Sequence, residues 1–285
     1  MAKEKLDTRA IGLDVGLSLM KWLTGSENLH YGDWTGLEVN ASNVLAAQEA
    51  YTARLFSLLP TEPSRILDIG GGAGVTARKL TDLGHTVEIV VPSAFLAERC
   101  RVNAPDAIVH EATFEAAELS GKFDLCLFSE SFQYVALDEG LAKCLTLLAD
   151  GGSIVLADCF RPEGFQLEKM RAKVGGGHRM ERFRAELAKL PLEIVAEEDI
   201  TEAVAPSVEI EQGLFNVVGH AVTRIDEELS AKRKGIRRTI GLVLKAVMSK
   251  RSRSRMSQRL MEQTRNRETF AENNRYLVMK LRPTG

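Results

Sequence analysis

The chain has 285 residues, of which 45% are hydrophobic and 27% are charged. This composition excludes a disordered chain and allows one large core or two modest ones. The formal net charge of −2 excludes a global field that would draw the protein to nucleic acid, so any such attraction must come from a local cluster of charge.

The N-terminal region, residues 1–60, is predicted to be helical around an aromatic and polar stretch, His30–Trp34, with an amphipathic run from Asn43 to Leu59. The first residues lack the apolar core and cleavage site of a signal peptide, and no apolar run is long enough to span a membrane. We therefore expect a cytoplasmic protein whose four widely spaced cysteines are buried, reduced thiols.

Residues 61–197 alternate between short apolar runs and helical spacing. The run Ile66–Ile69 is followed by a glycine-rich turn, a helical stretch over 75–83 and the β-branched run Val87–Val91. Further strands are expected at 107–110, 123–128 and 153–157, with helices at 93–102 and 139–148. Strands separated by helices predict a parallel sheet, because each crossover must travel back over one face.

Residues 198–272 separate a strand expected at 192–196 from a last strand at 276–281, within the final segment 273–285. Ile236, Ile240 and Val243 follow helical spacing, and Lys and Arg cluster from 232 to 255. Three interpretations stay open: a solvated helix pair docked on the core, a lid for an anionic or lipid-like acceptor with weak membrane or lipid contact, or a nucleic-acid surface. The lack of aromatic residues for base stacking disfavours the third, and no stable nucleic-acid partner is expected.

The most informative stretch is the turn from Asp68 to Gly74, with glycine at positions 70, 71, 72 and 74. Glycines let the backbone turn tightly and approach a ligand, and the N-terminus of the following helix offers free N–H groups. Dinucleotide-binding proteins use a similar turn. The carboxylate of Asp68 favours a different ligand, because it would repel a pyrophosphate and attract a cationic amino group.

The pattern Asp68-x-Gly70-x-Gly72-x-Gly74 resembles motif I of the class I methyltransferases that use S-adenosylmethionine (SAM). Residues 29–157 resemble the small-molecule branch of that family at Ala47–Tyr51, Phe123–Leu125, Phe128–Tyr134 and Leu148–Gly152. The resemblance implies an α/β, Rossmann-like, doubly wound sheet of seven strands, mainly parallel with the last one antiparallel. It also implies SAM as the cofactor, in-line methyl transfer, and an acceptor pocket built from residues 1–60 and 198–272.

The resemblance places the cofactor against the glycine turn and the ends of the neighbouring strands. The residues implied are Asp68, Gly70, Gly71, Gly72, Gly74, Val91, Ser93, Thr113, Phe114, Ser129, Tyr31 and Trp34. The rings of Tyr31 and Trp34 suit a sulfonium, because an aromatic face attracts cations. Phe114 either neighbours the adenine or packs in the core.

One position departs from the family. Val91 stands where the family usually has an acid that accepts hydrogen bonds from both ribose hydroxyls, and a valine cannot accept them. Ser93 or the backbone takes over, or the affinity for the cofactor falls, or the alignment is off by a residue or two.

Candidate catalytic residues follow the fourth and fifth expected strands. Glu130 and Tyr134 lie just past the fourth strand, where open α/β sheets bind their ligands. Glu130 is a base, a partner for an acceptor amine, or a helix cap. His178 follows three glycines and is either a proton acceptor or a polar residue at a helix start. No metal site is expected.

The function that the sequence favours is SAM-dependent methylation of a small-molecule acceptor at oxygen, nitrogen or carbon. A first alternative is a SAM-binding regulatory or assembly protein without transferase activity, favoured by Val91 and by the lack of an unambiguous base. A second is an RNA methyltransferase that grips its substrate through the basic segment, whose affinity would fall steeply with salt.

Overall fold

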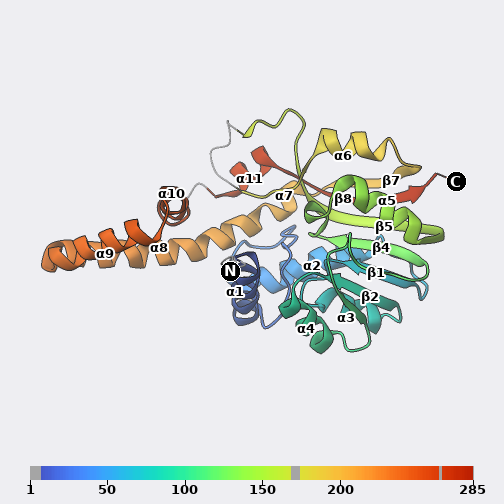
Figure 1. The fold of residues 1–285 in the computed structure, drawn as a ribbon, viewed down its shortest axis with the longest axis horizontal. Coiled ribbons are helices and arrows are strands. Elements are labelled where there is room, and N and C mark those ends of the chain that lie inside the picture. Colours follow the sequence, from blue (N-terminus) through green and yellow to red (C-terminus); the bar gives the residue numbers. More distant parts are fainter. Residues whose placement is uncertain (1–7, 168–173, 263–264, 285) are drawn as a thin grey trace, which may run out of the picture. The chain divides into compact units, whose positions relative to one another are not determined.

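The computed structural model describes residues 8–167, 174–262 and 265–284. The chain forms two compact units. The sheet unit comprises Met1–Phe165, Gly176–Val204 and Asn274–Gly285, and the helical unit comprises Gln166–Gly175 and Ala205–Asn273. Within the described ranges, every strand belongs to the sheet unit (Figure 1).

Seven strands of the sheet unit are hydrogen-bonded in the order β3-β2-β1-β4-β5-β8-β7. The strands are β1 (Arg65–Ile69), β2 (Thr86–Val91), β3 (Ile108–Glu111), β4 (Phe123–Ser129), β5 (Leu148–Arg161), β7 (Leu192–Asp199) and β8 (Arg275–Pro283), and the short β6 (His178–Arg179) pairs with β5. Strands β1 to β5 pair in parallel, whereas β8 is antiparallel to both β5 and β7. The predicted mainly parallel sheet with an antiparallel last strand is confirmed. Its order reverses between β1 and β4, which is where open α/β sheets place their ligands.

Helices follow the strands and bury one apolar side each. They are α3 (Val75–Asp82), α4 (Ala94–Asn103), α5 (Leu137–Leu147), α6 (Met180–Leu187) and α7 (Thr201–Val204). Leu141 of α5 and Phe183 of α6 join Leu67 and Ile69 of β1 in one large core cluster. Because side chains alternate along a strand, Asp68 points to the other face of the sheet.

The N-terminal region adds two helices to this unit, α1 (Thr8–Thr24) and α2 (Val44–Phe56), with a 3₁₀ turn at Ala41–Asn43. Leu17 of α1 packs with Ala73 and Leu96, which follow β1 and β2. Glu27 accepts hydrogen bonds from Lys21, Arg99 and Asn103. Burial opposes its ionisation, but these partners outweigh burial and hold the pKa of Glu27 at about 2. The region is therefore fixed to α4 by a buried charge cluster.

The helical unit consists of the long α8 (Pro206–Lys232), α9 (Lys234–Val247), α10 (Lys250–Ser257), a π-helical turn at Gln258–Glu262 and α11 (Arg267–Asn273). Gln212 of α8 donates to the carbonyl of Arg259 at 2.9 Å, and Arg267 forms a two-pronged ion pair with Glu209. None of the helices in the described ranges is long and apolar enough to cross a membrane.

The longer segment of the helical unit runs from Ala205 to Asn273. Before this segment, β7 continues to Asp199 beside β8, and Thr201 Oγ1 accepts a hydrogen bond from the backbone N–H of Tyr276. That residues 198–272 cap an acceptor site, and that residues 1–60 cover the cofactor, stay predictions.

Candidate functional site

The glycine turn leads directly from β1 into α3. Gly70 donates to the carbonyl of Val90 at 2.7 Å, and Gly70, Gly72 and Gly74 all have positive φ. A Cβ at Gly70 would collide with Ser131, and one at Gly74 would lie 2.8 Å from the Cα of Cys100. A Cβ at Gly72 would meet nothing within 4 Å. The flanking glycines are thus required by packing, whereas Gly72 borders open space.

Asp68 lies beneath this turn and is 1% exposed. Neither of its carboxylate oxygens has a hydrogen-bond partner among the residues that the structure describes. Burial raises the pKa of this carboxyl to about 7. A buried carboxylate without a partner is costly, so the arrangement suits a cationic group that enters the site and pairs with Asp68.

Val91 ends β2 on the same face of the sheet as Asp68. Asp68 pairs with Ile89, and Val91 lies two residues further along β2. Val91 is 1% exposed, and its register partner on β3 is Glu111. Ser93 caps α4 by accepting a hydrogen bond from Leu96 N–H at 3.3 Å. One acceptor position of the Ser93 hydroxyl is therefore already used.

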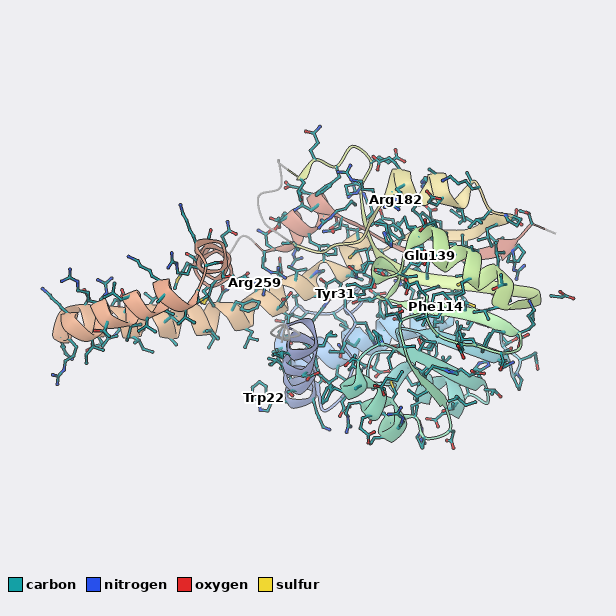
Figure 2. The ribbon with its side chains drawn as sticks, in the orientation of Figure 1. Trp22, Tyr31, Phe114, Glu139, Arg182 and Arg259 are labelled. Atoms are coloured by element: carbon teal, nitrogen blue, oxygen red, sulfur yellow. The ribbon has the colours of Figure 1, made fainter. Side chains whose placement is uncertain are left out.

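The two residues expected near an adenine lie in different environments. Phe114 is 3% exposed and packs edge-to-face on Phe128 within the large core cluster, with Lys143 Nζ 5.2 Å from its ring centroid. This environment favours the core-packing interpretation of Phe114 (Figure 2). Thr113 is exposed and starts a turn toward Ala116.

Glu130 comes directly after β4, at the point where the sheet order reverses. Within the described ranges it is the only residue other than glycine with positive φ, at 58°. Its Oε1 accepts hydrogen bonds from Tyr31 N–H at 2.7 Å and from Tyr276 Oη–H at 2.8 Å. Its Oε2 has no hydrogen-bond partner among the described residues. One oxygen is thus fixed and the other is available.

A chain of hydroxyl groups supports Glu130 from below. The hydroxyl of Tyr51 lies 2.9 Å from that of Tyr276 and 3.3 Å from Ser129 Oγ. Tyr51 also stacks on His30, with 4.6 Å between ring centroids. Tyr276 of β8 is therefore the direct partner of the carboxyl group, and Tyr51 of α2 and Ser129 of β4 are linked to it through hydroxyl contacts.

Burial raises the pKa of Glu130 to about 8. The negative charge of Asp158 raises this pKa further, whereas the hydrogen bonds from Tyr31 and Tyr276 lower it. Asp158 is fully buried on β5 and accepts hydrogen bonds from Gln133 N–H and Nε2, both at 2.9 Å. Burial also raises the pKa of Asp158 to about 7. At neutral pH, Glu130 is mostly protonated.

The other predicted catalytic residues lie outside this network. Tyr134 is 62% exposed, at the end of the turn Phe132–Tyr134. His178 Nε2 lies 3.0 Å from the carbonyl oxygen of Phe132, and burial lowers its pKa. A Cβ at Gly177 would collide with the carbonyl of Cys159, so β6 can pair with β5 only with glycine there. These contacts favour a structural role for the glycines and for His178.

The two N-terminal aromatic residues predicted to contact the cofactor lie in different environments. Tyr31 reaches Glu130 through its backbone N–H, and its ring centroid lies 6.2 Å from that of Tyr276. Trp34 is 5% exposed, and its backbone N–H donates to Ala203 at 2.9 Å. Tyr31 is thus placed at the site, whereas Trp34 packs in the unit.

Two residues of the network, Tyr276 and Asp158, were not identified from the sequence. Tyr276 lies 146 positions from Glu130 and meets it because β8 inserts beside β5. An aspartate inside the apolar run of β5 was the available signal for Asp158. Among the described residues, no group of three or more His, Cys, Asp or Glu side chains is arranged to hold a metal ion.

The sheet order, with a glycine turn at the point where the order reverses, is that of a Rossmann-like α/β fold. Residues 44–189 match the family described as "Methyltransferase domain", which covers more than half of the chain. The protein belongs to this methyltransferase family.

Similar proteins were found by sequence and by structure. The malonyl-(acyl-carrier protein) O-methyltransferase of Geobacter sulfurreducens is 33% identical over 122 residues, which cover 39% of this chain and 46% of that protein. The chain matches less than half the length of the curated relatives. The (4+2)-cyclase SpnF has a TM-score of 0.68 at 17% identity, covering 97% of this chain and 96% of that one.

A second similar structure is the geranyl diphosphate C-methyltransferase of Streptomyces coelicolor A3(2), solved with Mg²⁺, geranyl diphosphate and S-adenosyl-L-homocysteine. It has a TM-score of 0.64 at 13% identity and covers 98% of this chain and 100% of that one. At this identity the likeness shows the fold alone.

The residues of the site fit the cofactor that the family implies. The carboxylate of Asp68, which no described residue pairs with, suits the ammonium group of SAM, and the space beside Gly72 allows the backbone of the turn to approach the ligand. The end of β2 fits less well, because Val91 offers the ribose no acceptor.

We predict that Gly72→Ala weakens SAM binding roughly 5- to 150-fold, because the added methyl occupies ligand space and overpacking costs about 1–3 kcal/mol. Calorimetric titration with SAM measures this. Gly151→Ala is the matched control, because Gly151 also has positive φ, at 77°, with nothing within 4 Å of a Cβ. The control should lose stability but retain SAM affinity. Equal affinity of the Gly72 variant and wild type would remove the ligand from this turn.

We predict that Val91→Asp tightens SAM binding roughly 10- to 100-fold, the worth of a hydrogen bond to a charged acceptor. Val91→Asn introduces a side chain of the same shape as aspartate but without its charge, so it should increase the affinity for SAM less. Dissociation constants and melting temperatures are measured together, because Val91 is buried. If the folded Asp variant binds no more tightly, another group such as Ser93 already serves the ribose.

Proposed function

We propose that this protein transfers the methyl group of SAM to a small organic acceptor in the crevice at the carboxyl ends of β1 and β4. The observation that carries the proposal is Asp68, a buried carboxylate without a partner among the described residues, beneath a glycine turn that borders open space. The relatives' names support the class of acceptor, since they include a malonyl-(acyl-carrier protein) and a ubiquinone-biosynthesis O-methyltransferase.

We propose that one set of residues binds the cofactor and another acts on the acceptor. When bound, SAM supplies an electrophilic methyl group on a sulfonium. Asp68 pairs with its ammonium group, and the turn from Gly70 to Gly74 presents backbone to it. Asp68 and the turn thereby fix the orientation of the cofactor.

At the end of β4, we propose that Glu130 Oε2 accepts a proton from the acceptor as the methyl is transferred. Its fixed Oε1 sets the direction of the free oxygen, and its raised pKa makes it a stronger base than an exposed carboxylate. Tyr276 and Tyr31 are positioning residues, because they hold Oε1. Tyr134, which is largely exposed, and His178, whose Nε2 faces the carbonyl oxygen of Phe132, are assigned no proton transfer.

A second function, SAM binding without methyl transfer, is favoured by two observations. Val91 stands where the family usually has an acid that holds the ribose, and the fold is similar to that of a protein named as a (4+2)-cyclase. A fold does not determine the chemistry performed on it. Mass spectrometry of extracts incubated with the protein and methyl-labelled SAM separates the two functions, because only a transferase yields a labelled product.

With the acceptor in hand, we predict that kcat rises with pH through an apparent pKa near 8, because Glu130 must be ionised to accept a proton. Glu130→Gln should lower kcat roughly a hundredfold to ten-thousandfold and abolish this pH dependence, with SAM affinity retained. Tyr276→Phe should move the apparent pKa upward, since it removes a hydrogen bond that stabilises the carboxylate.

Glu139→Gln is the control, because Glu139 is an exposed acid in the first turn of α5. Its kinetics should match wild type. A Glu130→Gln enzyme that keeps the wild-type rate and pH profile would rule out the proposed base.

A further inference from the structure

The region from Ala231 to Arg259 carries an unbalanced positive charge. It contains eleven Lys and Arg residues and no Asp or Glu, although the whole chain has a net charge of −2. The cations are Lys232, Arg233, Lys234, Arg237, Arg238, Lys245, Lys250, Arg251, Arg253, Arg255 and Arg259. Such a cluster produces a positive local potential although the chain as a whole is slightly negative.

Helix α9 separates this charge from an apolar stripe. Ile236, Ile240, Val243, Leu244 and Val247 recur at spacings of three and four residues, so they share one side of the helix. At about 100° per residue, Lys234, Arg238 and Lys245 fall on the opposite side. The stripe is exposed: Val243 is 54% and Val247 78% accessible.

The neighbouring helix α8 also has an exposed apolar side. Leu214, Val218, Val222 and Ile225 are all exposed and share one side of α8. The two helices are joined by a two-pronged ion pair between Arg237 and Asp226, at 2.7 and 3.0 Å. Exposed apolar surface of this extent on a soluble fold marks an interaction site.

The acids at the end of α8 neutralise only one of the cations of α9. Asp226 pairs with Arg237, Glu227 with Arg224, and Glu228 with Lys232. In the described part of the chain, Lys234, Arg238 and Lys245 form no ion pair. The polar side of α9 therefore keeps cations that can bind external anions.

We propose that α9 binds the surface of an anionic lipid bilayer, with its apolar stripe inserted between the lipids and its cations toward the headgroups. A helix that combines an exposed apolar side with a Lys- and Arg-rich polar side has the properties of an interfacial helix. A phosphate backbone would match the cations but leave the stripe exposed. Residues 231–259 also contain no aromatic side chain on which bases could stack. The inference does not depend on the proposed methyl transfer.

The test is co-sedimentation of the full chain with vesicles of phosphatidylcholine alone and with added phosphatidylglycerol. Wild type should bind the anionic vesicles, and binding should weaken with salt and roughly fivefold for each cation removed. Val243→Asp should lose most of the binding by placing a charge on the apolar stripe. Lys234→Gln combined with Lys245→Gln should weaken it without changing the stripe.

Val102→Asp is the matched control, because Val102 is a 55% exposed valine on α4 of the sheet unit. It introduces the same charge and should bind vesicles like wild type. Calorimetric titration with SAM, unchanged in all variants, shows that the sheet unit is intact.

Three results would overturn the proposal. Wild type could fail to bind anionic vesicles, or Val243→Asp could bind them as well as wild type. Alternatively, wild type could bind a single-stranded RNA oligomer in preference to vesicles. If wild type ignores vesicles and forms a dimer that Val243→Asp dissociates, the occupant of the stripe is a second copy of the chain.

Discussion

The site depends on one buried carboxyl group that has no hydrogen-bond partner in the part of the chain that the structure describes. Asp68 sits on a central strand, 1% exposed, and burial raises its pKa to about 7. A carboxylate in this position lowers the stability of the folded chain unless a cation compensates it. The turn above it keeps glycine at position 72, where a side chain would meet no protein atom. A bound ligand with a cationic group would compensate the buried carboxylate and fill the space beside Gly72.

Glu130, directly after the neighbouring strand β4, depends on a different constraint, a strained backbone held by long-range contacts. Glu130 has a φ of 58°, a conformation that costs a residue with a Cβ about 1–2 kcal/mol. Its N–H donates to Ala157 at 2.8 Å, and its Oε1 is held by Tyr31 and Tyr276. Strain of this kind persists where the surrounding contacts over-determine it, and such positions cluster at functional sites.

The sequence predicted the parts of the molecule that local patterns determine. The glycine turn, the alternation of strands and helices and the antiparallel last strand followed from spacing and from the resemblance that the spacing carried. The partner Tyr276 of Glu130 did not, because it reaches Glu130 through the register of β8 against β5, which no local pattern encodes. His178 was singled out because it follows three glycines, yet the glycine at 177 is required by the close approach of Cys159. Phe114 stayed open because an aromatic residue after a strand suits both a ligand and a core.

The most direct test of the account is the proton balance of SAM binding, measured by calorimetry in two buffers with different ionisation enthalpies. Pairing with an ammonium group lowers the pKa of Asp68 from about 7, so near pH 7 about half a proton should leave on binding. Affinity should accordingly be full above pH 7 and fall as the pH drops below it, and Asp68→Asn should release no proton from this site. Binding heats that do not depend on the buffer, or a release that persists unchanged in Asp68→Asn, would contradict the pairing of Asp68 with the cofactor.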